Sequence, residues 1–154
     1  MIQRIQSIFL LFNALLGVYV LFWGGPFYTA SQGVRTASVD FMSVDINGVR
    51  VNDTVSLLLL AGIAFIAAGA IFLYQNRPLQ IKACWLGTGL SLLLGLMAFL
   101  RYRSVMSQLG EGGPVEGSLG LSFAAPFLMI TFFLLALRGI MKDEALIKGM
   151  DRLR

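Results

Sequence analysis

Four long apolar stretches constrain this chain more than any other feature. They cover about residues 5–23, 55–74, 83–100 and 119–137, and none of them contains Asp, Glu, Lys or Arg. Crossing a hydrocarbon core of about 30 Å takes roughly 20 apolar residues in an α-helix. The sequence therefore predicts an all-α membrane protein, a bundle of four transmembrane helices that forms a single domain over residues 1–154.

The composition supports a membrane location and includes few of the residue types that catalysis commonly uses. Hydrophobic residues make up 57% of the chain and charged residues 13%, against about 45–50% and about 25% in soluble domains. Histidine is absent and Cys84 is the only cysteine, so the usual general base, the commonest metal ligand and any internal disulfide are missing. We therefore expect no catalytic, cofactor-binding or metal-binding residues, and no enzyme.

The positions of Lys and Arg predict the direction in which the helices cross. With both chain ends in the cytoplasm, eight basic residues lie inside: Arg4, Arg77, Lys82, Arg138, Lys142, Lys148, Arg152 and Arg154. Four lie in the outer loops: Arg35, Arg50, Arg101 and Arg103. Short loops rich in Lys and Arg stay in the cytoplasm, which predicts an N-in, C-in topology. The same rule explains the net charge of +4 without a nucleic-acid partner.

The first outer loop carries the signal of a β-hairpin. Residues 38–52 read as two strands around Asn47-Gly48, a dipeptide typical of a two-residue type I′ turn. We therefore expect a small extracytoplasmic hairpin. Because a lone hairpin is marginal in water, it should lean on the second outer loop, the membrane face or a partner. That second loop, about residues 102–118, is rich in glycine but lacks the GK[ST] of a phosphate-binding loop, which predicts a surface turn.

Small and polar residues within the stretches indicate how the helices pack. Gly87, Ser91 and Gly95 recur every four residues, and Gly17 follows Asn13 by the same interval. Small residues let helix backbones approach closely, so we expect these positions to pack the bundle on itself, with a contact between two copies as the alternative. An unpaired amide is costly in hydrocarbon. For Asn13 we therefore expect an interhelical hydrogen bond, with substrate contact as the alternative.

Pro126 lies within the fourth stretch and has no amide hydrogen. Inside a helix it deprives the carbonyl four residues earlier, that of Ser122, of its partner, so the sequence predicts a kink. Transporters use broken helices at their binding sites. No other stretch contains a matching break, so the kink alone is weak support for transport.

The last residues, 138–154, form a charged and helix-prone tail. Its apolar residues fall near one helical face and its charges mostly elsewhere, which predicts a C-terminal cytoplasmic amphipathic helix. Such a helix lies on the anionic membrane surface or extends the fourth span, and docking on a partner is the alternative. The candidate docking residues are Lys142, Glu144, Ile147, Lys148 and Arg152.

The two chain ends carry a resemblance to a known family. The start MIQRIQSIFLLF and the end KDEALIKGMDRLR, with four spans between them, resemble an uncharacterised family of small four-span bacterial inner-membrane proteins that is defined as a domain of unknown function. The resemblance covers the whole chain. It implies the four-span architecture and the bacterial inner (cytoplasmic) membrane, and it carries no activity. Both ends lie on one side of the membrane, so the segment at Arg4 and the tail can meet.

Three classes of function remain. A non-enzymatic accessory or scaffold subunit agrees best with these features, and its contacts would be the lipid bilayer and a membrane-protein partner or a second copy. A small transporter or channel for ions is disfavoured because the apolar stretches contain no Asp, Glu, Lys or Arg. Transport of an apolar or lipid-like substrate would not need such groups and remains the alternative. An enzyme would need an outer site built from Arg101, Arg103, Glu111 and Glu116, whose spacing indicates none.

Overall fold

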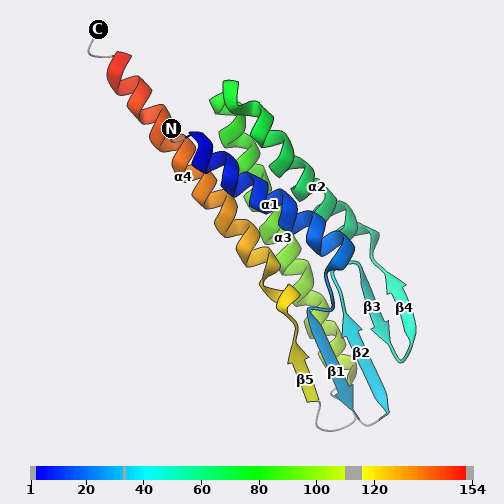
Figure 1. The fold of residues 1–154 in the computed structure, drawn as a ribbon. Coiled ribbons are helices and arrows are strands. Elements are labelled where there is room, and N and C mark those ends of the chain that lie inside the picture. The colour runs from blue at the N-terminus through cyan, green and yellow to red at the C-terminus, as the bar shows by residue number, and fades with distance from the viewer. Residues whose placement is uncertain (1–2, 33, 110–115, 152–154) are drawn as a thin grey trace.

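The computed structural model describes residues 3–32, 34–109 and 116–151, except for the side chains of residues 3–5, 32 and 147–151. The long helices in this part of the chain are α1 (Gln3–Trp23), α2 (Thr54–Phe72), α3 (Arg77–Leu109) and α4 (Ala125–Asp151). They form an up-and-down bundle in which α1 and α3 each pack against α2 and α4 (Figure 1). All four are long and apolar enough to cross a membrane, so the prediction of four long apolar helices is confirmed.

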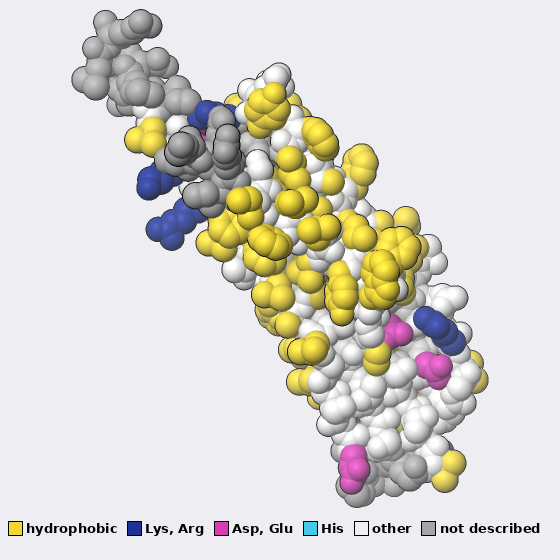
Figure 2. Space-filling view, in the orientation of Figure 1, with side chains coloured by type: hydrophobic (Ala, Val, Ile, Leu, Met, Phe, Trp, Pro, Cys, Tyr) yellow, Lys and Arg dark blue, Asp and Glu magenta, His cyan; other side chains and the backbone are white. Residues whose placement is uncertain are grey.

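The outer surface of the bundle is apolar. Phe22, Phe65 and Phe72 expose 74%, 79% and 80% of their surface, although a water-soluble protein rarely exposes contiguous patches of such side chains. Figure 2 shows hydrophobic side chains gathered over the middle of the helices and few over the strands. This distribution suits a bundle whose solvent is lipid.

Each helix turns one stripe of residues inward. On α1 the buried positions recur every three or four residues, the spacing of a single helical face: Gln6, Leu10, Asn13, Gly17 and Val20. The other helices fill the space between them with fully buried side chains: Leu60, Ile63, Leu94, Met129 and Phe133. The interior is therefore close-packed.

An antiparallel sheet of five strands covers one end of the bundle (Figure 1). After α1 come β1 (Tyr28–Gln32), β2 (Arg35–Val39), β3 (Ser43–Ile46) and β4 (Val49–Asn52), and β5 (Glu116–Leu119) lies between α3 and α4. Their spatial order is β4-β3-β2-β1-β5. We name this the sheet end of the bundle, and the opposite end, where α1 begins and α4 ends, the terminal end.

The predicted hairpin exists but is only part of this sheet. β3 and β4 pair around Asn47 and Gly48, whose φ angles of 54° and 82° are those of a type I′ turn. Its strands begin at Ser43, later than predicted, because the chain bends at residues 41–42. Strands β1, β2 and β5 were not predicted from the sequence. In YTASQ and RTASV fewer than half of the residues are β-branched or aromatic, and EGSL contains none, so the strand signal is weak.

Helix α3 is longer than the predicted third span and supports the sheet. It has 33 residues, or about 50 Å at 1.5 Å per residue. No glycine or proline interrupts the chain between Gly95 and Gly110, so no helix-breaking residue stops the helix where the apolar stretch ends. Its last turns bury Val105 and Leu109 within the same core as the inner side of the sheet. Arg101 and Arg103 therefore lie on a helix and not in a loop, which corrects the predicted boundaries.

Candidate functional site

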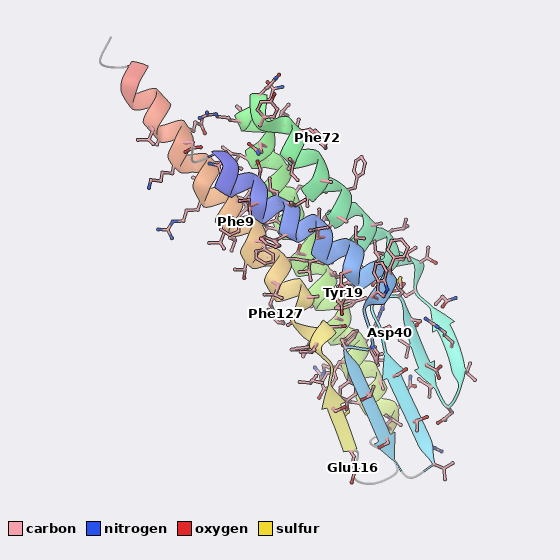
Figure 3. All side chains as sticks on the ribbon, viewed as in Figure 1. Phe9, Tyr19, Asp40, Phe72, Glu116 and Phe127 are labelled. Carbon is pink, nitrogen blue, oxygen red and sulfur yellow. The ribbon has the colours of Figure 1, made fainter. Side chains whose placement is uncertain are left out.

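The face of the sheet that points away from α3 forms a shallow, polar depression. Its volume is about 720 Å³, and its lining side chains are mostly hydroxyls: Thr29, Ser31, Thr36, Ser38 and Ser118, with Asp45 and Glu116. We name this surface the hydroxyl face. Glu116 lies at the far tip of β5 (Figure 3). The depression itself is lined by two carboxylates and, among the described residues, by no cation, while Arg50 points to the same side at the β4 edge. The depression therefore suits a polar or basic contact.

Strand register explains why these residues share a face. Residues that are paired across antiparallel strands point to the same side, and neighbours along a strand alternate. One row across the sheet reads Ser118, Thr29, Ser38, Asp45 and Arg50. The adjacent row, on the opposite face, reads Leu119, Tyr28, Val39, Val44 and Val51. The sheet is thus polar on one side and apolar on the other.

The two carboxylates of the hydroxyl face lie far apart. Asp45 lies on β3 and Glu116 on β5, three strand spacings apart, or about 14 Å, which is too far for the two carboxylates to act as a pair. Within the described ranges no cluster of His, Cys, Asp or Glu could hold a metal ion. The Thr29 and Ser118 hydroxyls bond to each other at 2.7 Å. The arrangement can therefore bind through hydrogen bonds and charge.

Arg101 on α3 connects the sheet end to the bundle. Its guanidinium forms an ion pair with Asp53, donates to the Ser56 hydroxyl at 2.7 Å and donates to the Phe41 carbonyl at 3.2 Å. Asp53 is also the N-cap of α2, where it accepts from the backbone amides of Val55 and Ser56. One side chain therefore joins α3, the start of α2 and the bend before β3. We name these contacts the Arg101 junction.

Tyr28 provides a second connection between the sheet and α3. Its hydroxyl donates to the Met106 sulfur at 2.9 Å, and its ring meets Tyr102 edge-on with centroids 4.8 Å apart. Gly117 on β5 leaves room for the Tyr28 ring, because a Cβ there would overlap the phenol. Burial, with a smaller contribution from Tyr102, raises the pKa of Tyr28. The phenol therefore stays protonated and available as a donor at neutral pH.

Asn13 lies fully buried in the bundle, where its amide nitrogen donates to the Met129 carbonyl of α4 at 3.0 Å. Its amide oxygen has no partner among the described residues. Four residues later, Gly17 faces α2, where a Cβ would come within 2.9 Å of the Ala64 methyl carbon. Asn13 and Gly17 therefore lie at the contacts of α1 with α4 and α2.

Replacing Asn13 with leucine is expected to change the free energy of unfolding by no more than about 1 kcal/mol. Interhelical hydrogen bonds in membranes average about 0.6 kcal/mol, and the substitution also removes a buried oxygen without a partner. Thermal unfolding in mild detergent measures the effect. Normal membrane insertion and stability, combined with a cellular defect, would contradict a packing role and assign Asn13 to ligand contact.

The row of small residues on α3 lies against α4. A Cβ at Gly87 would overlap the Phe133 ring, and one at Gly95 would lie 3.4 Å from Pro126. Ser91 is fully buried, and its hydroxyl donates to the Gly87 carbonyl one turn earlier on the same helix. These three positions therefore face the interior of the bundle in this structure.

The structure overturns the predicted kink at Pro126. Helix α4 begins at Ala125, so Pro126 is its second residue, a first-turn position where a missing amide hydrogen costs little. Leu121–Ala124 form the short 3₁₀-helix η3, and the Ser122 carbonyl accepts from the Ala125 amide. Proline therefore starts the helix and does not break it. The error arose because the apolar stretch includes residues that precede α4.

The tail continues α4 and is not a separate helix. Gln6 on α1 donates to the Asp143 carboxylate at 2.6 Å, and Gly139 makes room for the Gln6 side chain. The start of the chain and the tail therefore meet through Gln6, whereas the side chain of Arg4 lies outside the described residues. Lys142 is exposed and Glu144 partly exposed. The side chains of Ile147 and Lys148, and all of Arg152, also lie outside the described part.

A buried polar cluster at the terminal end was not anticipated from the sequence. Gln6, Gln80 and Asp143 are each at least nine-tenths buried, and Gln80 donates to the Ala70 carbonyl at 3.0 Å. Beside them, a cavity of about 10 Å³ also touches Arg77, which is about the volume that one water molecule needs. The seven-residue spacing between Gln6 and Asn13 was the available signal, since it places both amides on one face of α1.

Comparison with known proteins gives the family. Among curated proteins, none matches the chain. A family model described as a domain of unknown function, DUF4293, matches residues 2–153. The match includes both chain ends, whose sequences carried the resemblance, and all four long helices. The chain therefore belongs to the DUF4293 family.

Proposed function

We propose that this protein is a non-enzymatic scaffold or accessory subunit of a membrane complex, and that it presents the hydroxyl face to a partner. The observation that carries the proposal is the attachment of the sheet. The α3 extension, the Arg101 junction and Tyr28 hold the strands against the bundle, with the hydroxyl face turned away from it. A polar surface held in this way, without a catalytic pair, serves recognition.

The charge distribution supports an orientation with the sheet outside the cytoplasm of a bacterial inner membrane. Lys82, Arg138 and Lys142 are exposed at or near the terminal end, and cytoplasmic segments are enriched in Lys and Arg. Arg101, at the sheet end, is neutralised by its ion pair with Asp53. The pairing weakens the strongest objection to an N-in, C-in topology.

The packing of the bundle weighs against transport of a lipid-like substrate. Gly17 brings α1 against Ala64 of α2, and Gly87 brings α3 against Phe133 of α4. A substrate path between α1 and α2 would require the first contact to open, and a path between α3 and α4 would require the second to open. The scaffold proposal requires no such movement.

Placing an arginine in the middle of the hydroxyl face is expected to release the partner. Ser38 occupies the central strand of the polar row, so Ser38→Arg fills the depression and opposes a basic partner. The measurement is purification from native membranes in mild detergent, with mass spectrometry of the proteins that remain bound. A defined partner should be retained by the wild-type protein and lost from the variant.

Two further variants serve as controls. Val34→Arg adds the same charge at a fully exposed position that does not line the face, and it should retain the partner. A chain ending at Leu146 keeps the Gln6–Asp143 hydrogen bond but removes the end of the tail. If only this truncation releases the partner, the tail is the docking surface and the proposal fails. Absence of any partner at normal membrane levels also contradicts it.

A further inference from the structure

The sheet has two open edges. β4 and β5 are the outermost strands of the order β4-β3-β2-β1-β5 (Figure 1), and no strand in the described part of the chain pairs with their outer sides. All eight residues of these strands are exposed. An edge strand presents unpaired backbone N–H and C=O groups, which form a template for another strand.

The apolar row of the sheet is buried in the middle and exposed at both edges. The row that runs Leu119, Tyr28, Val39, Val44 and Val51 is buried in the middle, at Tyr28 and Val39. Its two ends are open, because Leu119 on β5 is 62% exposed and Val51 on β4 is 64% exposed. One further strand on either side would cover an end of this row.

The two edges carry opposite charges on the other face. On β4, Arg50 points to the side of the hydroxyl face, and its side chain is 60% exposed. On β5, Glu116 points to the same side and is exposed. Within one copy, Arg50 donates to the Ser43 hydroxyl at 3.0 Å and forms a long ion pair with Asp40 at 4.0 Å. A solvent-exposed pair of this kind is weak, so a second carboxylate can compete for the guanidinium. Each edge therefore complements the opposite edge of the same chain, apolar to apolar and positive to negative.

We propose that β4 of one copy pairs with β5 of the next, so that the sheet continues from molecule to molecule along the membrane. Four antiparallel steps separate β4 from β5, so the two strands run in the same direction. Copies that share one membrane orientation therefore bring them together as a parallel pair. With the rows aligned, Val51 meets Leu119 and Arg50 reaches Glu116.

The dimensions of the molecule permit this assembly. Five strands at about 4.8 Å repeat every 24 Å or so. Two helices side by side, with axes 8–10 Å apart and diameters of 10–12 Å, span roughly 20 Å. The lateral repeats of the strands and the helices therefore match. Since neighbouring strands are rotated by about 20–25°, the contact between two copies must reverse the twist that builds up within one sheet. Strands of four residues form few hydrogen bonds, so each contact is weak and depends on the high local concentration of copies in a membrane.

Disulfide cross-linking in native membranes tests the proposal. In a background with Cys84→Ala, the variants Val51→Cys and Leu119→Cys are made singly and together, and the membranes are oxidised before a non-reducing gel. Paired strands bring Cα atoms within the 4.4–6.8 Å or so that a disulfide needs. The double variant should give a ladder beyond the dimer. The two single variants should give a dimer when co-expressed and only monomer alone.

Three outcomes would overturn the proposal. Dimers from Val51→Cys alone would show that two β4 edges meet. A second double variant, Val34→Cys with Leu119→Cys, serves as a control, because Val34 lies in the turn before β2. If this control cross-links as much as Val51→Cys with Leu119→Cys, the cross-links reflect random collision. No cross-linking of a normally inserted double variant would exclude the contact.

The charges supply an independent readout of the same contact. Arg50→Glu in the double-cysteine variant should lower the cross-linked fraction about 2- to 5-fold, because it replaces an attraction with a repulsion at an exposed pair. Adding Glu116→Arg should restore the fraction by reversing both signs. If the second substitution does not restore it, Arg50 and Glu116 do not meet across copies. The result does not depend on what binds the hydroxyl face, so failure here leaves the scaffold proposal in place.

Discussion

Replacing Arg101 with alanine is expected to destabilise the protein by about 3 kcal/mol. Removing one partner of a buried ion pair costs roughly 3–5 kcal/mol, and the low end applies because the side chains of Arg101 and Asp53 are 17% and 25% exposed. The substitution also frees the Ser56 hydroxyl and the Phe41 carbonyl. Thermal unfolding in mild detergent measures the loss, and protease sensitivity of the strands should rise because their attachment to α3 is lost.

Two neighbouring variants make this result specific. Arg103 lies two residues further along α3 and is exposed, so Arg103→Ala should change stability by less than about 0.5 kcal/mol. Arg101→Lys should be intermediate, since lysine keeps the charge but lacks the planar fork that reaches several acceptors. Equal stability of Arg101→Ala and Arg103→Ala would refute the Arg101 junction as the attachment of the sheet.

Replacing Gly87 with leucine is expected to destabilise the bundle by about 3 kcal/mol or more. Even a Cβ at this position would overlap the ring of Phe133, which is fully buried. Inserting carbons into a well-packed core typically costs about 1–3 kcal/mol and occasionally more, and leucine adds four. Leucine and the ring cannot both occupy the present contact, so the Phe133 side chain or the two helices must shift. Thermal unfolding in detergent measures the effect.

Gly89 provides the matched control for Gly87. It lies two residues further on the same helix and is exposed, and a Cβ at this position would meet no atom within 4 Å. Gly89→Leu should therefore leave stability unchanged or raise it slightly, because leucine favours a helix more than glycine does. The double variant Gly87→Leu, Phe133→Ala should recover part of the loss by emptying the space opposite. If the double variant is no more stable than Gly87→Leu alone, the destabilisation does not arise from the overlap with Phe133.

The long helices could be predicted from the sequence because one physical property determines them. An apolar run of about 20 residues has few stable alternatives to a helix that buries its own backbone hydrogen bonds. The turn at Asn47-Gly48 was predictable for an equally local reason, since it requires positive φ at two consecutive residues. Both features depend on neighbours in the sequence.

The sheet and the candidate site could not be predicted because they depend on distant partners. β5 reads EGSL within a glycine-rich loop, and nothing in those four residues indicates that β1 lies beside them. From the sequence Arg101 was expected in a loop at the border of the third stretch. In the structure it lies on α3, where it forms an ion pair with Asp53 and donates to the Phe41 carbonyl. Pro126 was misplaced because hydropathy does not distinguish η3 from the first turn of α4.

The pairing of β1 with β5 has a consequence for biosynthesis. Thr29 and Ser118, neighbours in the finished sheet, are 89 residues apart in the chain. At about 5–20 residues per second, translation separates them by roughly 4–18 s, and in the proposed membrane topology α2 and α3 enter the bilayer during that time. A chain with one span left out would present β5 on the wrong side of the bilayer, and β1 would stay without its neighbour. In the proposed topology the sheet can close only after α2 and α3 have both been inserted, so its closure reports correct insertion of these two helices.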